Sequence, residues 1–270
     1  MPIALFLSPH LDDVAFSCGG TFASLAHQGW QCVLLTAFTR SVPNPTGFAL
    51  ACQTDKGLPA EVDYLALRRQ EDTAAASLLG AATVRWLDLP EAPHRGYQSA
   101  AALFADLLPS DDIGQQIETL LRHELAALQP QLLFAPQGLG LHVDHRRLMQ
   151  AVRAAAGELP VLWYRDTPYI IRQPTAQPAP ELPTNLGEVA VPLSAEALEA
   201  KIAASQAYCT QVPFQFGGPE QAASKLHALA QAEGQAAGLN SVAERFSIHA
   251  EHLAALPSGL RLHTPLAIKT

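Results

Sequence analysis

The feature that most constrains the fold is a regular alternation of short apolar segments with helical patterns. Residues 3–8 and 31–37 are continuous apolar runs, which are typical of strands buried on both faces of a sheet. Between them, residues 14–29 are rich in alanine and end at Gly29, a residue that commonly terminates helices. Strand, helix and strand within about 35 residues predict a βαβ unit with a right-handed crossover.

The same alternation continues along the chain. The patterns predict helices over residues 65–79, 113–128 and 144–156, and strands over residues 83–88, 131–135 and 161–165. Repeated βα alternation is typical of a parallel sheet covered by helices on both faces. We therefore expect an α/β fold with a Rossmann-like, doubly wound and mostly parallel sheet.

Two segments interrupt this pattern. Residues 39–63 hold three prolines and many polar side chains, which predicts a long loop that covers the site as a lid. Residues 172–186 hold four prolines and predict an extended connection. Helical patterns follow over residues 194–209 and 219–237, and the rest is expected to form a short tail.

The chain shows no internal repeat, and its 270 residues suit one large α/β domain. We expect a single domain over residues 1–270. Its α/β core, which should hold the functional site, spans residues 1–170. Residues 171–270 are expected to form a C-terminal elaboration of the same domain.

Composition excludes several classes of function. The 17 basic and 25 acidic residues give a net charge of −8, unlike the basic surface of a nucleic-acid binder. No run of 18 or more apolar residues predicts a membrane span, and the N-terminus lacks the charged start of a secretory signal. The four cysteines have no Cys-x-x-Cys spacing, which indicates reduced thiols and a cytoplasmic protein.

Polar clusters follow two of the predicted strands. Residues 8–13 (Ser-Pro-His-Leu-Asp-Asp) come directly after the first strand, and residues 142–145 (His-Val-Asp-His) follow the strand over 131–135. Ligands of open α/β sheets bind at the carboxyl ends of the strands. We therefore expect the two clusters to meet at one edge of the sheet.

The residue types in these clusters suit a metal-dependent hydrolase. His10 and Asp13 are three residues apart and project to one side of a helical turn, as do His142 and His145. A catalytic zinc ion typically takes three protein ligands and leaves one position for water, and two histidines with one carboxylate meet that count. The remaining donors would supply a base and a polar group facing a substrate carbonyl.

Each cluster alone also has a purely structural interpretation. Asp12 or Asp13 would then cap the following helix, and Asp144 would cap the helix after a solvated loop. The occurrence of both clusters at strand ends favours the metal site. No Gly-x-Gly-x-x-Gly fingerprint follows the first strand, so a nucleotide-binding protein is disfavoured, and Gly19–Gly20 is attributed to close helix packing.

The clusters resemble the signatures of the LmbE-like, or PIG-L, N-deacetylases. The two metal motifs that carry the resemblance are Pro9-His10-Leu11-Asp12-Asp13 with Cys18-Gly19-Gly20, and His142-Val143-Asp144-His145. Arg68-Arg69-Gln70-Glu71, followed by Leu79-Gly80, is similar to the family's Arg-x-x-Glu helix. Weaker similarities to a bacterial subgroup lie at Lys201, Tyr208, Gln211 and Glu244-Arg245-Phe246. The resemblance covers about residues 3–250.

This resemblance implies a Rossmann-like sheet, a mononuclear zinc ion and a set of roles. The implied zinc ligands are His10, Asp13 and His145. Asp12 would be the general base, His142 would face the carbonyl oxygen and Asp144 would orient His142. Arg68 would hold sugar hydroxyls. Fe²⁺ or Co²⁺ would fit the same ligands.

One departure from the family pattern concerns the first motif. The common sequence is His-Pro-Asp-Asp-Glu, whereas Leu11 and Val14 replace the proline and the glutamate here. The implied ligand and base positions are retained. Val14 removes a carboxylate near the metal, so the tuning of the site and its substrate preference are expected to differ.

Several further side chains are candidates for substrate contacts. Glu91 and Arg95, with His94 between them, follow the strand over 83–88 at the same edge and would bind sugar hydroxyls or an anionic aglycone. The alternative is a solvated loop. For Arg68 the alternative is a surface ion pair with Glu71 or Asp72. Two tryptophans in strand patterns, Trp86 and Trp163, are expected in the core.

The sequence therefore predicts a zinc-dependent hydrolase that removes the acetyl group from an N-acetylated sugar of the N-acetylglucosamine type. Its partner would be a small-molecule N-acetyl sugar conjugate, and the sequence indicates no oligomeric state. A first alternative is a metal hydrolase acting on another amide or an ester. A second is a non-catalytic sugar-binding or regulatory protein with a relic metal site.

Overall fold

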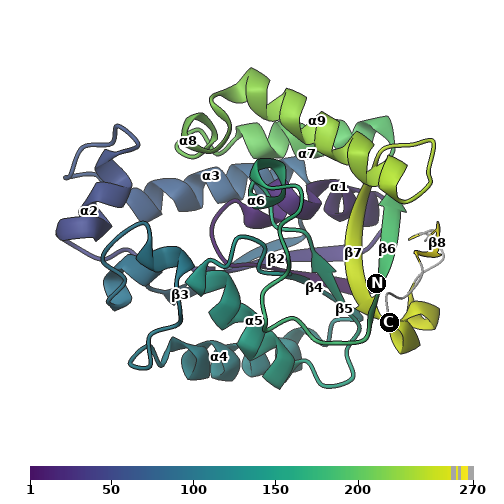
Figure 1. Cartoon of the computed structure of the whole chain (residues 1–270), viewed down its shortest axis with the longest axis horizontal. Coiled ribbons are helices and arrows are strands. Elements are labelled where there is room, and N and C mark those ends of the chain that lie inside the picture. The colour runs from purple at the N-terminus through teal and green to yellow at the C-terminus, as the bar shows by residue number, and fades with distance from the viewer. Residues whose placement is uncertain (257–259, 261–262, 267–270) are drawn as a thin grey trace.

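A computed structural model describes residues 1–256, 260 and 263–266 of the chain. Its strands form one sheet in the order β3-β2-β1-β4-β5-β7-β6-β8 (Figure 1). Their bounds are β1 Ile3–Ser8, β2 Gln31–Phe38, β3 Thr83–Leu89, β4 Leu132–Pro136, β5 Val161–Tyr164, β6 Leu186–Pro192, β7 Ala243–His249 and β8 His263–Leu266.

The sheet is parallel from β3 to β5 and antiparallel beyond it. β1 pairs in parallel with β2 on one side and with β4 on the other, and the parallel register continues to β3 and β5. β7 runs antiparallel to both β5 and β6. The prediction of a mostly parallel, doubly wound sheet is confirmed. Strand order reverses between β1 and β4, which is where open α/β sheets bind ligands.

Helices cover both faces of this sheet (Figure 1). One face carries α1 Asp13–His27, α3 Tyr64–Leu78, α7 Ala195–Gln206 and α9 Pro219–Ala236; the other carries α4 Ile113–Leu128 and α5 Val143–Ala155. The shorter helices are α2 Gly47–Thr54, α6 Tyr169–Arg172, α8 Val212–Phe216, η1 Ala92–Arg95, η2 Ala102–Phe104 and η3 Ala250–Ala255. Within the described residues, none of the helices combines the length and apolar character that a membrane crossing requires.

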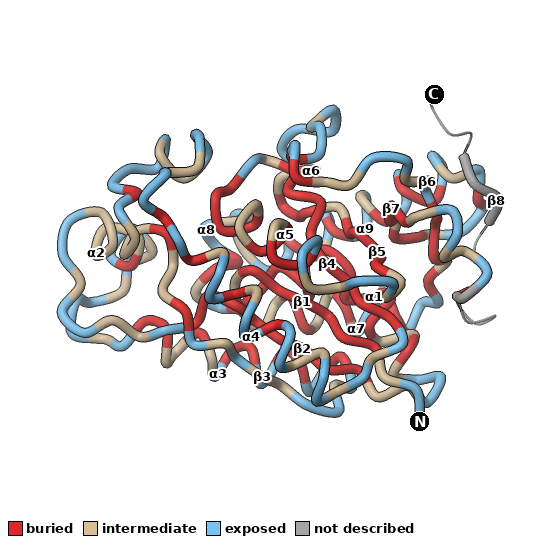
Figure 2. Tube along the Cα trace, turned by 90° about the horizontal axis from the view of Figure 1, so that it is seen from below, coloured by how far each residue is buried: buried red, intermediate tan, exposed pale blue. Residues whose placement is uncertain are grey.

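The continuous apolar runs are explained by burial on both faces of the sheet (Figure 2). Successive side chains of a strand point to opposite faces, so each strand contributes to two cores. In β1, Phe6 stacks on Phe134 with ring centroids 4.1 Å apart in the core under α1. Its neighbour Leu7 packs with Leu133 in the core under α5.

Helix packing explains the glycine pair in α1. A Cβ atom on Gly20 would lie 2.5 Å from Cδ1 of Leu193, and one on Gly19 would lie 3.2 Å from Cγ of Lys201. Leu193 lies just before α7, and Lys201 lies within it. Close packing is therefore the reason for the two glycines, as the sequence indicated.

Four sequence-based expectations about structure were wrong. The loop over residues 39–63 contains α2, and the supposed tail contains β7 in the interior of the sheet. β6 was also missed, because its glycine and terminal proline weaken the strand pattern. Trp163 is 1% exposed, as expected, but Trp86 is 39% exposed because β3 is an edge strand of the described sheet.

Candidate metal and catalytic site

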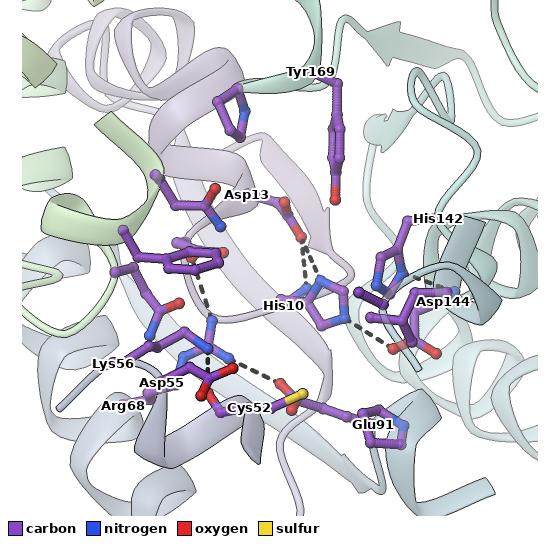
Figure 3. A pocket seen from close by; sticks show the side chains of 18 of the residues that line it. His10, Asp13, Cys52, Asp55, Lys56, Arg68, Glu91, His142, Asp144 and Tyr169 are labelled. Carbon is purple, nitrogen blue, oxygen red and sulfur yellow. Dashed lines mark hydrogen bonds and ion pairs between the residues drawn. The ribbon is translucent and has the colours of Figure 1, made fainter. Parts of the chain in front are cut away.

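The two polar clusters meet where β1 and β4 end (Figure 3). His10 lies in the turn after β1, and Asp13 is the first residue of α1. His142 and His145 lie at the start of α5, which follows β4. The neighbouring strands thus bring together residues that are about 130 positions apart in the sequence.

The expected ligand atoms converge on Asp13. Its Oδ2 lies 3.3 Å from Nδ1 of His10 and 3.4 Å from Nε2 of His145. Ligand atoms of a tetrahedral zinc site, with metal bonds of about 2.0–2.1 Å, are separated by about 3.3 Å. Ring nitrogens of His10, His142 and His145 also lie within 4.8 Å of one another. The donor set therefore fits a divalent metal ion, with His142 as an alternative ligand.

An unpartnered buried atom supports the same fit. Nε2 of His145 is buried and has no hydrogen-bond partner among the described residues. The opposite ring nitrogen, Nδ1, lies 2.6 Å from Oδ1 of Asp166. A buried polar atom without a partner is costly unless a ligand satisfies it. Although burial lowers the pKa of His145, the carboxylates of Asp13 and Asp166 raise it overall.

Asp166 is a site residue that the sequence analysis missed. It lies two residues after β5 and is fully buried. Its second oxygen, Oδ2, accepts a hydrogen bond of 3.0 Å from the backbone amide of Leu139. The available signal was its place after the strand adjacent to β4, at the same edge of the sheet as the two clusters.

Asp12 has the surroundings of a proton acceptor. Its side chain is buried beside Arg68, whose Nη2 lies 3.3 Å from Oδ2. Burial raises the pKa of Asp12 to about 7, against the lowering effect of the Arg68 guanidinium. Burial also disfavours the charge of Asp13, but His145 and His10 hold the pKa of Asp13 below its usual range. Neither carboxylate caps α1, because Asp12 forms no side-chain cap hydrogen bond and Oδ2 of Asp13 accepts one from the backbone amide of His10 instead.

His142, rather than Asp144, caps α5. Nδ1 of His142 accepts a hydrogen bond of 3.2 Å from the backbone amide of Asp144. Burial, followed by the charge of His10, lowers the pKa of His142 to about 3. The imidazole is therefore neutral in this structure. With Nδ1 as acceptor, Nε2 is the nitrogen that carries the proton.

The side chain of Asp144 hydrogen-bonds His10 and not His142, so the only hydrogen bond from Asp144 to the His142 ring comes from its backbone amide. Its Oδ2 lies 2.9 Å from Nε2 of His10 and accepts a hydrogen bond from the amide of Ala92. Its Oδ1 accepts a hydrogen bond of 2.6 Å from Nη2 of Arg95. Burial raises the pKa of Asp144, but Arg95 and His10 lower it well below its usual range.

The two arginines expected to bind substrate occupy different places. Arg68 lines the cavity above Asp12, and its Nη1 lies 2.8 Å from Oε1 of Glu91, another lining residue. The alternative of a surface ion pair was wrong, because the Arg68 side chain is only 5% exposed. Arg95 does not line this cavity, and its guanidinium pairs with the carboxylates of Asp111 and Asp144. Its expected contact with substrate is therefore not supported.

A cavity of about 240 Å³ opens above these groups (Figure 3). Segment 39–63, which was expected to cover the site, forms part of its wall through Phe48 and Lys56. Phe104 and Phe214 line the cavity from η2 and α8 and are 43% and 58% exposed. No sequence motif pointed to these apolar side chains, because they lie far along the chain from both metal motifs. Val14, where the family has a carboxylate, is buried in the core below α1.

Comparison with known proteins places these observations in a family. The model of the PIG-L family, described as GlcNAc-PI de-N-acetylase, matches residues 5–156. A 2'-N-acetylparomamine deacetylase from Streptomyces fradiae is 33% identical over 167 residues, which cover 61% of this chain and 57% of the relative. A protein of the same name from Niallia circulans is 34% identical over 186 residues, covering 61% of this chain and 66% of the relative. Each match thus spans less than two thirds of the relative's length.

The similarity in structure extends over more of the chain. A deacetylase from the biosynthesis pathway of teicoplanin superposes with a TM-score of 0.80 at 25% sequence identity. The superposition covers 91% of this chain and 97% of that protein. It therefore includes the C-terminal part of the fold that the family model leaves unmatched.

Proposed function

The chain belongs to the PIG-L family of de-N-acetylases, and from this premise we propose that it is a metal-dependent hydrolase that removes the acetyl group from an N-acetylated amino sugar. The observation that carries the proposal is the convergence of Asp13 Oδ2 on His10 Nδ1 and His145 Nε2, beside the buried carboxylate of Asp12. A metal site next to a proton acceptor is the arrangement that amide hydrolysis requires.

His10, Asp13 and His145 would hold the metal ion. Two imidazoles and one carboxylate favour zinc, and Fe²⁺ or Co²⁺ would fit the same donors. When bound, the metal supplies Lewis acidity, which activates water and polarises the substrate carbonyl. The contacts from Asp166 and Asp144 orient the rings of His145 and His10 for this task.

Asp12 is the proposed general base. A carboxylate with a pKa of about 7 is ionised in a large fraction of molecules at neutral pH and is basic enough to take a proton from the attacking water. Arg68, 3.3 Å away, fixes the position of the carboxylate. The protonated Asp12 then delivers its proton to the departing amine nitrogen.

His142 is the proposed donor to the carbonyl oxygen. Its Nδ1 is engaged by the amide of Asp144, so the Nε2–H group is available at the cavity that His142 lines. A fixed neutral donor stabilises the negative charge that develops on this oxygen. The low pKa of His142 means that the proposed mechanism relies on a neutral imidazole.

The sugar is proposed to bind against Arg68 and Glu91, whose paired side chains line the cavity next to Asp12. The exposed rings of Phe104 and Phe214 leave an apolar surface for the group attached to the sugar. The substrate is therefore proposed to be a small-molecule N-acetyl sugar conjugate with an apolar aglycone. This proposal predicts a lower KM for an aryl glycoside of N-acetylglucosamine than for the free sugar.

The test combines metal analysis with an activity assay. Purified protein is analysed for bound metal and assayed for acetate release from N-acetylglucosamine and its aryl glycosides, with His10→Ala as control. About one metal ion per chain and acetate release that the variant abolishes would support the proposal. A metal-loaded protein that cleaves other amides or phosphoesters would indicate another hydrolase. Metal without any turnover would indicate a binding protein.

A further inference from the structure

Helix α1, whose first turn carries Asp13, is broken at Cys18. This residue has φ −135° and ψ 24°, which is not a helical conformation. The break separates residues 13–17 from the longer segment that runs to His27. Carbonyl groups before a break and amide groups after it lose their helical partners, and buried groups of this kind need other ones.

A buried ion pair supplies partners on both sides of the break. The carboxylate of Glu244 accepts hydrogen bonds from the amides of Gly20, at 3.0 Å, and Thr21, at 2.7 Å. Nζ of Lys201 donates to the carbonyl of Ser17, at 3.1 Å, and to Oε1 of Glu244, at 2.6 Å. A carboxylate before the second segment also suits the positive end of its helix dipole.

Two further contacts fix the first turn of α1. Oγ of Ser205 donates to the carbonyl of Ala15, at 3.4 Å, and the amide of Thr167 donates to Oγ of Ser17, at 3.0 Å. Ser205 belongs to α7 with Lys201, and Glu244 belongs to β7. All of these partners lie outside residues 5–156, the part matched by the family model.

We propose that the Lys201–Glu244 ion pair is a positioning device for the metal centre. It holds α1 in its broken form, so that the turn containing Asp12 and Asp13 points to the β1–β4 edge independently of the rest of the helix. The side chains of the pair are only 2% and 4% exposed. Buried ion pairs add little net stability compared with apolar side chains, so stability alone does not account for them. The inference rests on the proposed role of Asp13 as a metal ligand.

The test measures metal affinity apart from catalysis. Zinc dissociation constants are determined by competition with a chromophoric chelator for the wild-type protein, Lys201→Met and Glu244→Gln. Each variant is expected to bind zinc about tenfold more weakly, as is typical when contacts behind metal ligands are lost. In assays with saturating zinc, kcat should fall while KM changes little, because the sugar contacts at Arg68 and Glu91 remain.

The double variant Lys201→Met/Glu244→Gln separates positioning from stability. It leaves no unpaired buried charge, so it should regain much of the thermal stability that Glu244→Gln loses. Its zinc affinity should stay low, because the contacts at Ser17, Gly20 and Thr21 are still altered. Recovery of both stability and zinc affinity in the double variant would overturn the proposal.

Arg245→Gln is the matched control. Arg245 neighbours Glu244 on β7, but its side chain pairs with Glu233 and Glu188. This variant should lower Tm and leave the zinc dissociation constant unchanged. If zinc affinity fell together with Tm in every variant, including Arg245→Gln, the proposal would be overturned.

If Lys201→Met does not fold, Ser205→Ala replaces it. This variant removes only the hydroxyl contact to Ala15 and should weaken zinc binding about threefold. An unchanged dissociation constant in Ser205→Ala and Glu244→Gln would overturn the inference. Weakened zinc binding in a protein that releases no acetate would support the positioning device and reject only the proposed deacetylase activity.

Discussion

Oδ1 of Asp166 lies 2.6 Å from Nδ1 of His145, and this contact determines which ring nitrogen faces the candidate metal centre. With the proton on Nδ1, between the ring and the carboxylate, the lone pair of Nε2 points to Asp13 and the other donors. Hydrogen bonds of this kind fix the tautomer and the orientation of metal-binding histidines.

Replacing Asp166 with asparagine tests this contact. The amide nitrogen would donate where the carboxylate accepted, which favours the tautomer with its proton on Nε2 and blocks the ligand atom. Asp166→Asn is expected to weaken metal binding about 10- to 100-fold. Chelator competition measures the change, and unaltered affinity in a folded variant would remove Asp166 from the metal centre.

Asp12→Asn tests the proposed role of Asp12 as general base. The amide cannot take a proton, so kcat should fall by about 10²–10⁴. Metal content should remain at the wild-type level, because Asp12 is not among the proposed ligands. Parallel metal analysis and acetate-release assays check both points. Near-normal turnover in the variant would assign proton transfer to another group.

Removal of the metal should lower thermal stability. Binding to the folded state alone stabilises it by about 4 kcal/mol when free metal exceeds its dissociation constant a thousandfold. The chelator-treated protein should therefore melt at a lower temperature and recover on addition of zinc. His145→Ala should abolish this recovery together with activity. A variant that still gains stability from zinc would show that His145 is not required for binding.

Arg95→Met distinguishes structural from substrate contacts. The variant leaves the buried carboxylate of Asp144 without its ion pair, which should cost about 3 kcal/mol of folding free energy. KM for the sugar should stay near the wild-type value, because Arg95 does not line the cavity. Arg68→Gln, at the cavity wall, should instead raise KM. Urea unfolding and steady-state kinetics of both variants make the comparison.

Gly20→Ala tests the close packing of α1. The added methyl group would lie 2.5 Å from Cδ1 of Leu193, and relief of this contact should destabilise the fold by about 1–3 kcal/mol. Gly187→Ala is the control, since its Cβ would meet no atom closer than 3.9 Å outside its chain neighbours. Denaturant unfolding of both variants should show a loss of stability only for Gly20→Ala.

The parts of the fold that the sequence predicted depend on local patterns. The apolar runs of β1, β2 and β4 arise from burial on both faces, which the sequence shows directly. β6 and β7 are antiparallel, and their positions in the sheet depend on the pairing of β7 with β5 and with β6. Such pairing joins distant segments and leaves a weak local pattern, so these strands were missed.

In the candidate site too, local patterns were readable from the sequence, and contacts between distant segments were not. Strand ends and residue types predicted that the histidines and Asp13 would meet. The partner of Asp144 was misjudged because residues two positions apart in a helical turn project to opposite sides, which directs its carboxylate away from His142. Asp166 and the apolar cavity wall come from other segments of the chain, and only the three-dimensional arrangement reveals them.

The position of β7 between β5 and β6 affects how the sheet can form while the chain is being synthesised. Residues 243–249 leave the ribosome after nearly all of the described chain, yet they fill an inner place in the sheet. Until they arrive, β5 presents an open hydrogen-bonding edge, which invites pairing with other nascent chains. Yield of soluble protein should therefore depend on chaperones that shield this edge until residues 243–249 have been synthesised.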